Sequence, residues 1–161
     1  MYQINEIVVY ENGDLYKVKD IGIPDFITSD RKYYTLESLE NKKNVVYVTL
    51  ANEEKLRPVI SRETASDCLA KLPDIEGQYN PNAKERDKEY LDVIKNGGCL
   101  GRLKMFKGIL QEKNRRLGTG KQLCVSDDRY LQKVEKLINY EFSIALNIPF
   151  EELRSKIEHT V

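Results

Sequence analysis

The chain contains 161 residues, of which 40% are hydrophobic and 32% charged, and its 26 basic side chains balance 26 acidic ones. This length suits one large domain or two small ones, and no apolar run approaches the roughly 18 residues that a membrane-spanning helix requires. Because the N-terminus also lacks the basic region and apolar core of a signal peptide, we expect a cytoplasmic protein.

The cysteines and the histidine argue against a metal site. Cys68, Cys99 and Cys124 lie far apart in the sequence, and His159 is the only histidine. A structural zinc ion needs about four ligands at close spacing. We therefore expect no metal and no cofactor, and we expect the cysteines of a cytosolic chain to be reduced and mostly buried.

No pattern in the sequence indicates catalysis. The histidine stands alone near the C-terminus, without a serine, cysteine or carboxylate that the sequence places beside it. Gly118-x-Gly120-Lys121 shares glycines and a lysine with phosphate-binding loops, but a Walker A loop follows a strand and has Ser or Thr after the lysine. Gln122 follows here, in a helical region. We expect a helix connector at this position and a protein that is not an enzyme.

The N-terminal part of the chain shows the two-residue period of β-strands. Ile7–Tyr10 is β-branched and aromatic, and it runs into Asn12-Gly13, a strong hairpin signal. Further strands are expected at about 15–21, 32–36 and 45–50. Four or five short strands within about sixty residues predict a small antiparallel barrel of SH3 or Tudor type.

From Ser61 onward the pattern changes to the period of helices. Ser61 and Asn82 are expected to cap the first two helices, the second with Glu85 three residues further on. Helices are predicted at about 62–72, 83–96, 100–117 and 126–146, with a short fifth helix after Pro149.

These elements predict an α+β protein with two domains. The β domain covers residues 1–60, and a bundle of about five helices covers residues 61–161. The stretch 73–81, with its prolines and glycine, is expected to be the interdomain connection.

Basic side chains concentrate in one stretch of the helical domain. Residues 102–121 hold seven basic side chains against a single acidic one, Glu112. The apolar residues Leu103, Phe106, Leu110 and Leu117 share one arc of the third predicted helix, with cations on both flanks. Such cations can bind a phosphate backbone, although an ordinary solvated helix face gives the same pattern. The seven are Arg102, Lys104, Lys107, Lys113, Arg115, Arg116 and Lys121.

The strand expected at 45–50 is a second candidate site. It is apolar, β-branched and preceded by a basic loop. At an open sheet edge, its unpaired N–H and C=O groups could accept a partner strand. A strand of a closed barrel has the same pattern, so the sequence leaves both possibilities open.

The order of several motifs resembles the CarD/CdnL family of bacterial transcription regulators. Residues 2–10 resemble the family's opening motif, and Tyr33-Tyr34-Thr35-Leu36 resembles its paired-tyrosine strand. Leu56–Ser61 is similar to the family's LR-x-x-I-S. Further on, Leu123–Leu131 and Glu141–Leu146 resemble its L-S-x-x-E-x-x-x-L and E-L-A-L-A motifs. The resemblance covers essentially the whole chain, and the order of the motifs is more specific than any one of them.

The resemblance implies a Tudor-like domain that binds RNA polymerase, joined to a helical DNA-binding domain. In the family, the edge strand of the β domain pairs with the lobe of the polymerase β subunit. The helical domain contacts promoter DNA at the upstream edge of the transcription bubble, without sequence specificity, and stabilises the open complex. We therefore expect nucleoid association through polymerase, with neither a membrane nor a small-molecule substrate as a partner.

The resemblance also assigns residues to these two roles. The polymerase-binding strand corresponds to Val45, Val46, Tyr47, Val48 and Thr49. The expected DNA-binding residues are Arg86, Lys88, Lys107 and Arg129 from the resemblance, together with Lys104, Lys113, Arg115 and Arg116 from the charge pattern.

The chain also departs from the family pattern. A tryptophan that commonly precedes the second helix, and acts as a minor-groove wedge, is replaced by Ala83, and the chain has no tryptophan. Asn5 and Glu6 stand where the opening motif has glycine and aspartate, and Tyr47 stands where a basic residue is common. These changes affect DNA melting more than polymerase binding. The alternative function is a peptide-binding adaptor or dimerisation module that binds neither polymerase nor DNA.

Overall fold

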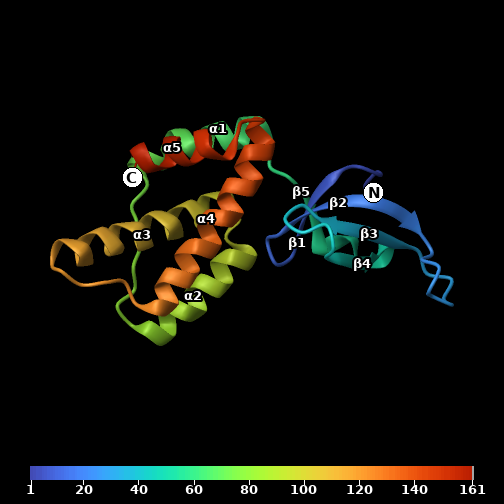
Figure 1. Cartoon of the computed structure of the whole chain (residues 1–161), viewed down its shortest axis with the longest axis horizontal. Helices are drawn as coiled ribbons and strands as arrows, with labels where there is room; N and C mark the ends of the chain where they lie inside the picture. The colour runs from blue at the N-terminus through green and yellow to red at the C-terminus, as the bar shows by residue number, and fades with distance from the viewer. Residues whose placement is uncertain (161) are drawn as a thin grey trace. The chain divides into compact units, whose positions relative to one another are not determined.

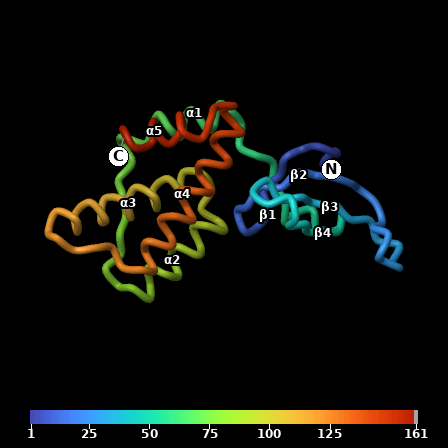
Figure 2. The backbone as a smooth tube through the Cα atoms, in the orientation of Figure 1, coloured from blue at the N-terminus to red at the C-terminus, as the bar shows by residue number. Residues whose placement is uncertain are grey.

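The computed structural model describes residues 1–160, which fold into two compact units (Figures 1 and 2). The first is Met1–Val59 and the second is Ile60–Val161. Each has a hydrophobic cluster of its own. The first is built from strands and the second from helices, so the expected α+β class is confirmed.

The first unit is a five-stranded antiparallel sheet in the described residues, with the strand order β4-β3-β2-β1-β5. The strands are β1 (Ile7–Tyr10), β2 (Leu15–Gly22), β3 (Tyr33–Ser38), β4 (Val45–Thr49) and β5 (Leu56–Pro58) (Figure 1). Val8, Val18, Tyr34 and Leu36 are fully buried in its core. In this part of the chain β4 and β5 are the two edges and do not pair, so the sheet is not closed and the expected barrel of SH3 or Tudor type is not confirmed.

The predicted hairpin at Asn12-Gly13 joins β1 to β2. The Tyr10 N–H donates to the Asp14 carbonyl at 3.0 Å, which leaves a loop of three residues. Gly13 has a φ of +88°, whereas Asn12 does not lie in the left-handed region. The turn is therefore the three-residue type, in which a single left-handed residue suffices, and not the two-residue type that the sequence suggested.

A bulge bends the sheet, and a short helix connects its two edge strands. The pairing of β2 with β3 shifts register between Val18 and Asp20, and such a bulge bends a strand and increases its twist. A 3-10 helix, Leu50–Lys55, then leads from β4 at one edge to β5 at the other.

The second unit is a helical bundle. It contains α1 (Arg62–Lys71), a 3-10 turn at Leu72–Asp74, α2 (Ala83–Asn96), α3 (Gly98–Gly118), α4 (Val125–Leu146) and α5 (Phe150–Thr160). Helix α3 packs against α1, α2 and α4, and α4 also packs against α1 and α5 (Figure 1). Leu103, Phe106 and Ile109 of α3 are buried, but Leu117, expected in the same core stripe, is 56% exposed near the end of the helix.

Both predicted N-caps are confirmed. The Ser61 hydroxyl accepts from the Thr64 N–H at 3.0 Å, and the side-chain oxygen Oδ1 of Asn82 accepts from the backbone N–H groups of Lys84 and Glu85. These bonds satisfy backbone donors that have no partner within the first turn of a helix. Local chemistry therefore fixes where α1 and α2 begin.

The stretch 73–81 is not an interdomain connection. It lies inside the second unit, where Ile75 is buried in the core. Gly77 and Gln78 pass so close to Gly108 of α3 that a side chain at position 108 would overlap the Gln78 backbone. Gly77, which was part of the pattern for an interdomain connection, and Gly108 of α3 instead permit close packing of a loop on a helix.

None of the helices in the described part of the chain has both the length and the apolar character needed to cross a bilayer.

Candidate partner and nucleic-acid interfaces

Strand β4 forms one edge of the sheet and, within residues 1–160, pairs with β3 alone. At its two ends the Ser38 N–H donates to the Asn44 carbonyl at 3.0 Å, and the Leu50 N–H donates to the Lys32 carbonyl at 3.1 Å. Hydrogen-bonded pairs alternate with non-bonded pairs along an antiparallel ladder. The even-numbered residues of β4 therefore bond to β3.

The odd-numbered residues Val45 and Tyr47 direct their backbone N–H and C=O groups toward the open edge. Their side chains also face outward, with exposed fractions of 41% and 39%, whereas Val48 is buried and Val46 packs against the core. An edge of this kind presents the unpaired groups that an added strand needs.

An aromatic side chain from outside β4 adjoins this edge. Phe26, in the loop between β2 and β3, contacts Tyr47 with 5.0 Å between the ring centroids and 77° between the ring planes. Phe26 is 68% exposed. Exposed aromatic rings in contact with each other commonly mark interaction surfaces. Phe26 was not among the residues expected at this site, because an isolated aromatic residue in a polar loop gives no periodic signal in the sequence.

Basic residues flank the edge strand at both ends. Lys42 and Lys43 precede β4, and Arg31 and Lys32 adjoin its other end through the Leu50 to Lys32 hydrogen bond. All four are exposed. The edge therefore has an apolar centre between two positively charged ends.

Arg86, an expected DNA contact, lies in the interior of the helical unit. It is 6% exposed, and its Nε atom lies 2.9 Å from Asp127 Oδ1. Its Nη1 donates to the Asn80 carbonyl, and its guanidinium group lies 4.6 Å from the centre of the Tyr79 ring. Arg86 thus fastens α2 to α4 and to the loop before α2, and it is removed from the expected DNA-binding set.

Lys107 and Arg102 of α3 are also interior residues. Lys107 is 6% exposed, and its ammonium group donates to the carbonyls of Leu72 and Pro73 at 2.8 and 3.1 Å. Arg102 is 4% exposed and lies 3.7 Å from Glu141. Lys107 is therefore also too buried to be one of the expected DNA-binding residues. The physical reason is that α3 packs against three other helices, so its middle part, from Arg102 to Ile109, is largely buried.

The remaining candidate cations lie nearer the surface. Lys88 of α2 and Arg129 of α4 are exposed, and Lys104 of α3 is half-buried. A denser group occurs at the C-terminal end of α3 and in the loop that follows. It consists of Lys113, Arg115, Arg116 and Lys121, and we call it the α3-end cluster.

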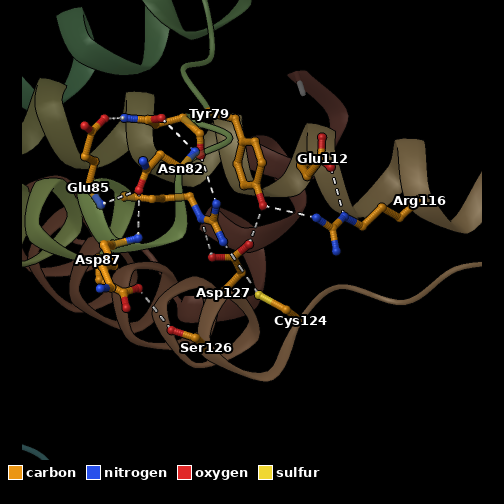
Figure 3. Close-up of polar contacts among 12 residues, drawn as sticks. Tyr79, Asn82, Glu85, Asp87, Glu112, Arg116, Cys124, Ser126 and Asp127 are labelled. Carbon is orange, nitrogen blue, oxygen red and sulfur yellow. Dashed lines mark hydrogen bonds and ion pairs between the residues drawn. The ribbon is translucent and has the colours of Figure 1, made fainter.

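Glu112 organises two members of this cluster. Arg115 and Arg116 contact its carboxylate at 2.6 and 2.9 Å. The hydrogen bond from Arg115, aided by that from Arg116, outweighs burial and lowers the pKa of Glu112 to about 2. Arg116 also donates to the Tyr79 hydroxyl, which donates to Asp127 at 2.7 Å (Figure 3). Burial and the hydrogen bond to Asp127 raise the pKa of Tyr79 to about 12.

Among residues 1–160, no group of three or more histidine, cysteine or carboxylate side chains is arranged to hold a metal ion. Comparison with models of known protein families gives no match, and comparison with curated protein sequences finds no similar protein.

Proposed function

We propose that this chain is a transcription regulator of the CarD type, which binds the RNA polymerase β subunit through β4 and promoter DNA through its helical unit. The open edge at β4 is the observation on which the proposal rests. The opposite edge, β5, is three residues long and ends in Pro58, which makes it a poorer template for a partner strand. The five residues of β4 have no proline.

The N-terminal segment supports the resemblance at the level of the backbone. Asn5 has a φ of +74° and stands where the family's opening motif has glycine. Glycine and asparagine are the residues that enter this left-handed region most easily, so the conformation of Asn5 is compatible with a glycine at this position of the motif. The strand order and the bend in β2 likewise fit an SH3- or Tudor-like sheet that is curved without being closed.

The proposed DNA contact is the α3-end cluster. Its residues 113–121 contain four cations and no carboxylate; Arg115 and Lys121 are exposed, and Lys113 and Arg116 are half-buried. Cations in such a position bind phosphates without reading the base sequence. Lys88, Lys104 and Arg129 supply further positive charge on the surface of the unit.

Retention of the full-length protein by the isolated polymerase β lobe tests the first part. Tyr47→Pro removes an outward N–H but no hydrogen bond to β3, so it should lower affinity at least tenfold. Tyr47→Val keeps the N–H group and should retain more binding than Tyr47→Pro. Failure of the unaltered protein to bind the lobe would contradict the proposal and favour the peptide-binding adaptor or dimerisation module.

The salt dependence of duplex DNA affinity tests the second part. Each phosphate contact contributes about one unit to the slope of log affinity against log salt. Changing both Lys113 and Lys121 to alanine should therefore reduce the slope by about two. Lys133→Ala, an exposed lysine of α4, is the matched control and should leave the slope unchanged. Equal slopes for all three proteins would exclude the α3-end cluster as the DNA-binding surface.

A further inference from the structure

Two of the three cysteines meet in the helical unit. Cys68 of α1 and Cys99 of α3 are 31 positions apart in the sequence, and their sulfur atoms lie 3.0 Å apart. Both are free thiols. A disulfide has a sulfur–sulfur bond of about 2.05 Å, so oxidation requires an approach of only about 1 Å.

We propose that Cys68 and Cys99 are a redox modification site, at which a low-molecular-weight disulfide such as oxidised glutathione closes a reversible α1–α3 crosslink. The pair belongs to the helical unit alone and does not depend on the proposed polymerase or DNA contacts.

The two thiols have different surroundings, which assigns them different roles. Cys99 is half-buried and lies in the first turn of α3, so it is the more accessible of the two residues to an oxidant. Cys68 is 8% exposed, and burial, followed by its hydrogen bond with Cys99, raises the pKa of its thiol to about 12. Cys99 is therefore the thiol that meets the oxidant, and Cys68 is the resolving thiol.

The exchange proceeds in two balanced steps. The Cys99 thiolate attacks one sulfur of oxidised glutathione, forms a mixed disulfide and expels one glutathione thiolate. Cys68 then loses its proton and attacks the Cys99 sulfur, forming the protein disulfide and expelling the second glutathione thiolate. The two protein thiols lose two electrons in total, the oxidant gains them, and the two released protons convert the leaving thiolates to thiols.

The crosslink would fix α1 to the central helix of the bundle. Closing a loop of this length lowers the conformational entropy of the unfolded chain. We expect the thermal midpoint of the helical unit to rise by roughly 10 °C on oxidation. Amide exchange in α1 should slow in parallel.

The experiment incubates the full-length protein with mixtures of oxidised and reduced glutathione, blocks free thiols by alkylation and maps the unreduced peptides. The expected product joins Cys68 to Cys99 within one chain and leaves Cys124 alkylated. Cys124→Ser is the matched control and should oxidise like the unaltered protein. Cys68→Ala should stop at a glutathione adduct on Cys99, and its helical content should be checked by circular dichroism.

Two results would overturn the inference. One is that Cys68 and Cys99 are both still free thiols, and are alkylated once the protein is unfolded, after incubation at the highest ratio of oxidised to reduced glutathione. The other is that the products are links between chains or links through Cys124. Neither result depends on whether the protein binds polymerase or DNA.

Discussion

Asp127 shows how a single buried carboxylate affects the stability of the helical unit. Its carboxylate is fully buried and accepts hydrogen bonds from Arg86 and from the Tyr79 hydroxyl. Arg86→Ala would leave this buried charge without its cation, and breaking a buried ion pair in this way typically costs about 3–5 kcal/mol.

We therefore expect Arg86→Ala to lower the free energy of unfolding, measured with urea, by about 3–5 kcal/mol. Lys88→Ala, two residues further along the same helix and exposed, should change the free energy of unfolding by no more than about 0.5 kcal/mol. Similar stabilities for the two variants would contradict the structural role given to Arg86.

Glu112 predicts a specific dependence of stability on acid. Its pKa is about 2 in the folded protein, below its ordinary value of 4.5, because Arg115 and Arg116 bond to the ionised form. A lowered folded-state pKa stabilises the protein above the unfolded-state pKa, and this contribution is lost as the pH falls from about 4.5 toward about 2.

Glu112→Gln should flatten this part of the stability profile. The contribution should amount to about 1–2 kcal/mol, since Arg115 is largely solvated and the pair is screened. Urea unfolding at a series of pH values between 5 and 3 measures the effect. A variant whose stability falls with acid as steeply as that of the unaltered protein would show that Glu112 is not the titrating group.

At the scale of elements, α3 contains one glycine whose replacement would force a neighbouring loop to move. A Cβ at position 108 would overlap the Gln78 backbone, whereas a Cβ at position 101 would have only Val93 within contact distance, at 3.8 Å. Both glycines lie within α3, where alanine is intrinsically favoured by about 0.5–1 kcal/mol.

Gly108→Ala should therefore destabilise the protein by about 1–3 kcal/mol, because it displaces the loop before α2. Gly101→Ala, the matched control, should stabilise it by about 0.5 kcal/mol or more. Thermal or urea unfolding shows whether each variant is less stable or more stable than the unaltered protein. If both variants were more stable than the unaltered protein, the loop would not be packed against α3.

At the scale of the whole molecule, two separate cores predict separate responses to core mutations. Val8 is fully buried in the sheet unit and has no part in the helical cluster. Val8→Ala leaves a cavity that typically costs about 2 kcal/mol or more.

Hydrogen exchange followed by mass spectrometry should then show roughly 30-fold faster exchange in peptides from β1, β2 and β3. Peptides from α3 and α4 should exchange at their original rates. Gly108→Ala is the reciprocal variant and should affect the helical peptides alone. Equal acceleration in both units would mean that the chain unfolds as a single cooperative structure.

The sequence by itself determined the features that depend on near neighbours. The alternation in Ile7–Tyr10, the caps at Ser61 and Asn82 and the period of the helices involve residues within a few positions of one another. Hydrogen bonding and amphipathic burial act over that range, so the α+β class and most element boundaries could be read in advance.

Only the tertiary structure decided which of the basic residues reach the surface. Arg86 meets Asp127 across 41 positions, and Lys107 meets the Leu72 carbonyl across 35. A basic helix flank has the same sequence pattern whether it faces water or a distant carboxylate, because burial of a charge depends on partners that the fold brings together. The open edge of β4, the contact between Tyr47 and Phe26 and the proximity of the Cys68 and Cys99 sulfur atoms also depend on residues that are distant in the sequence. Only the folded chain brings those residues together.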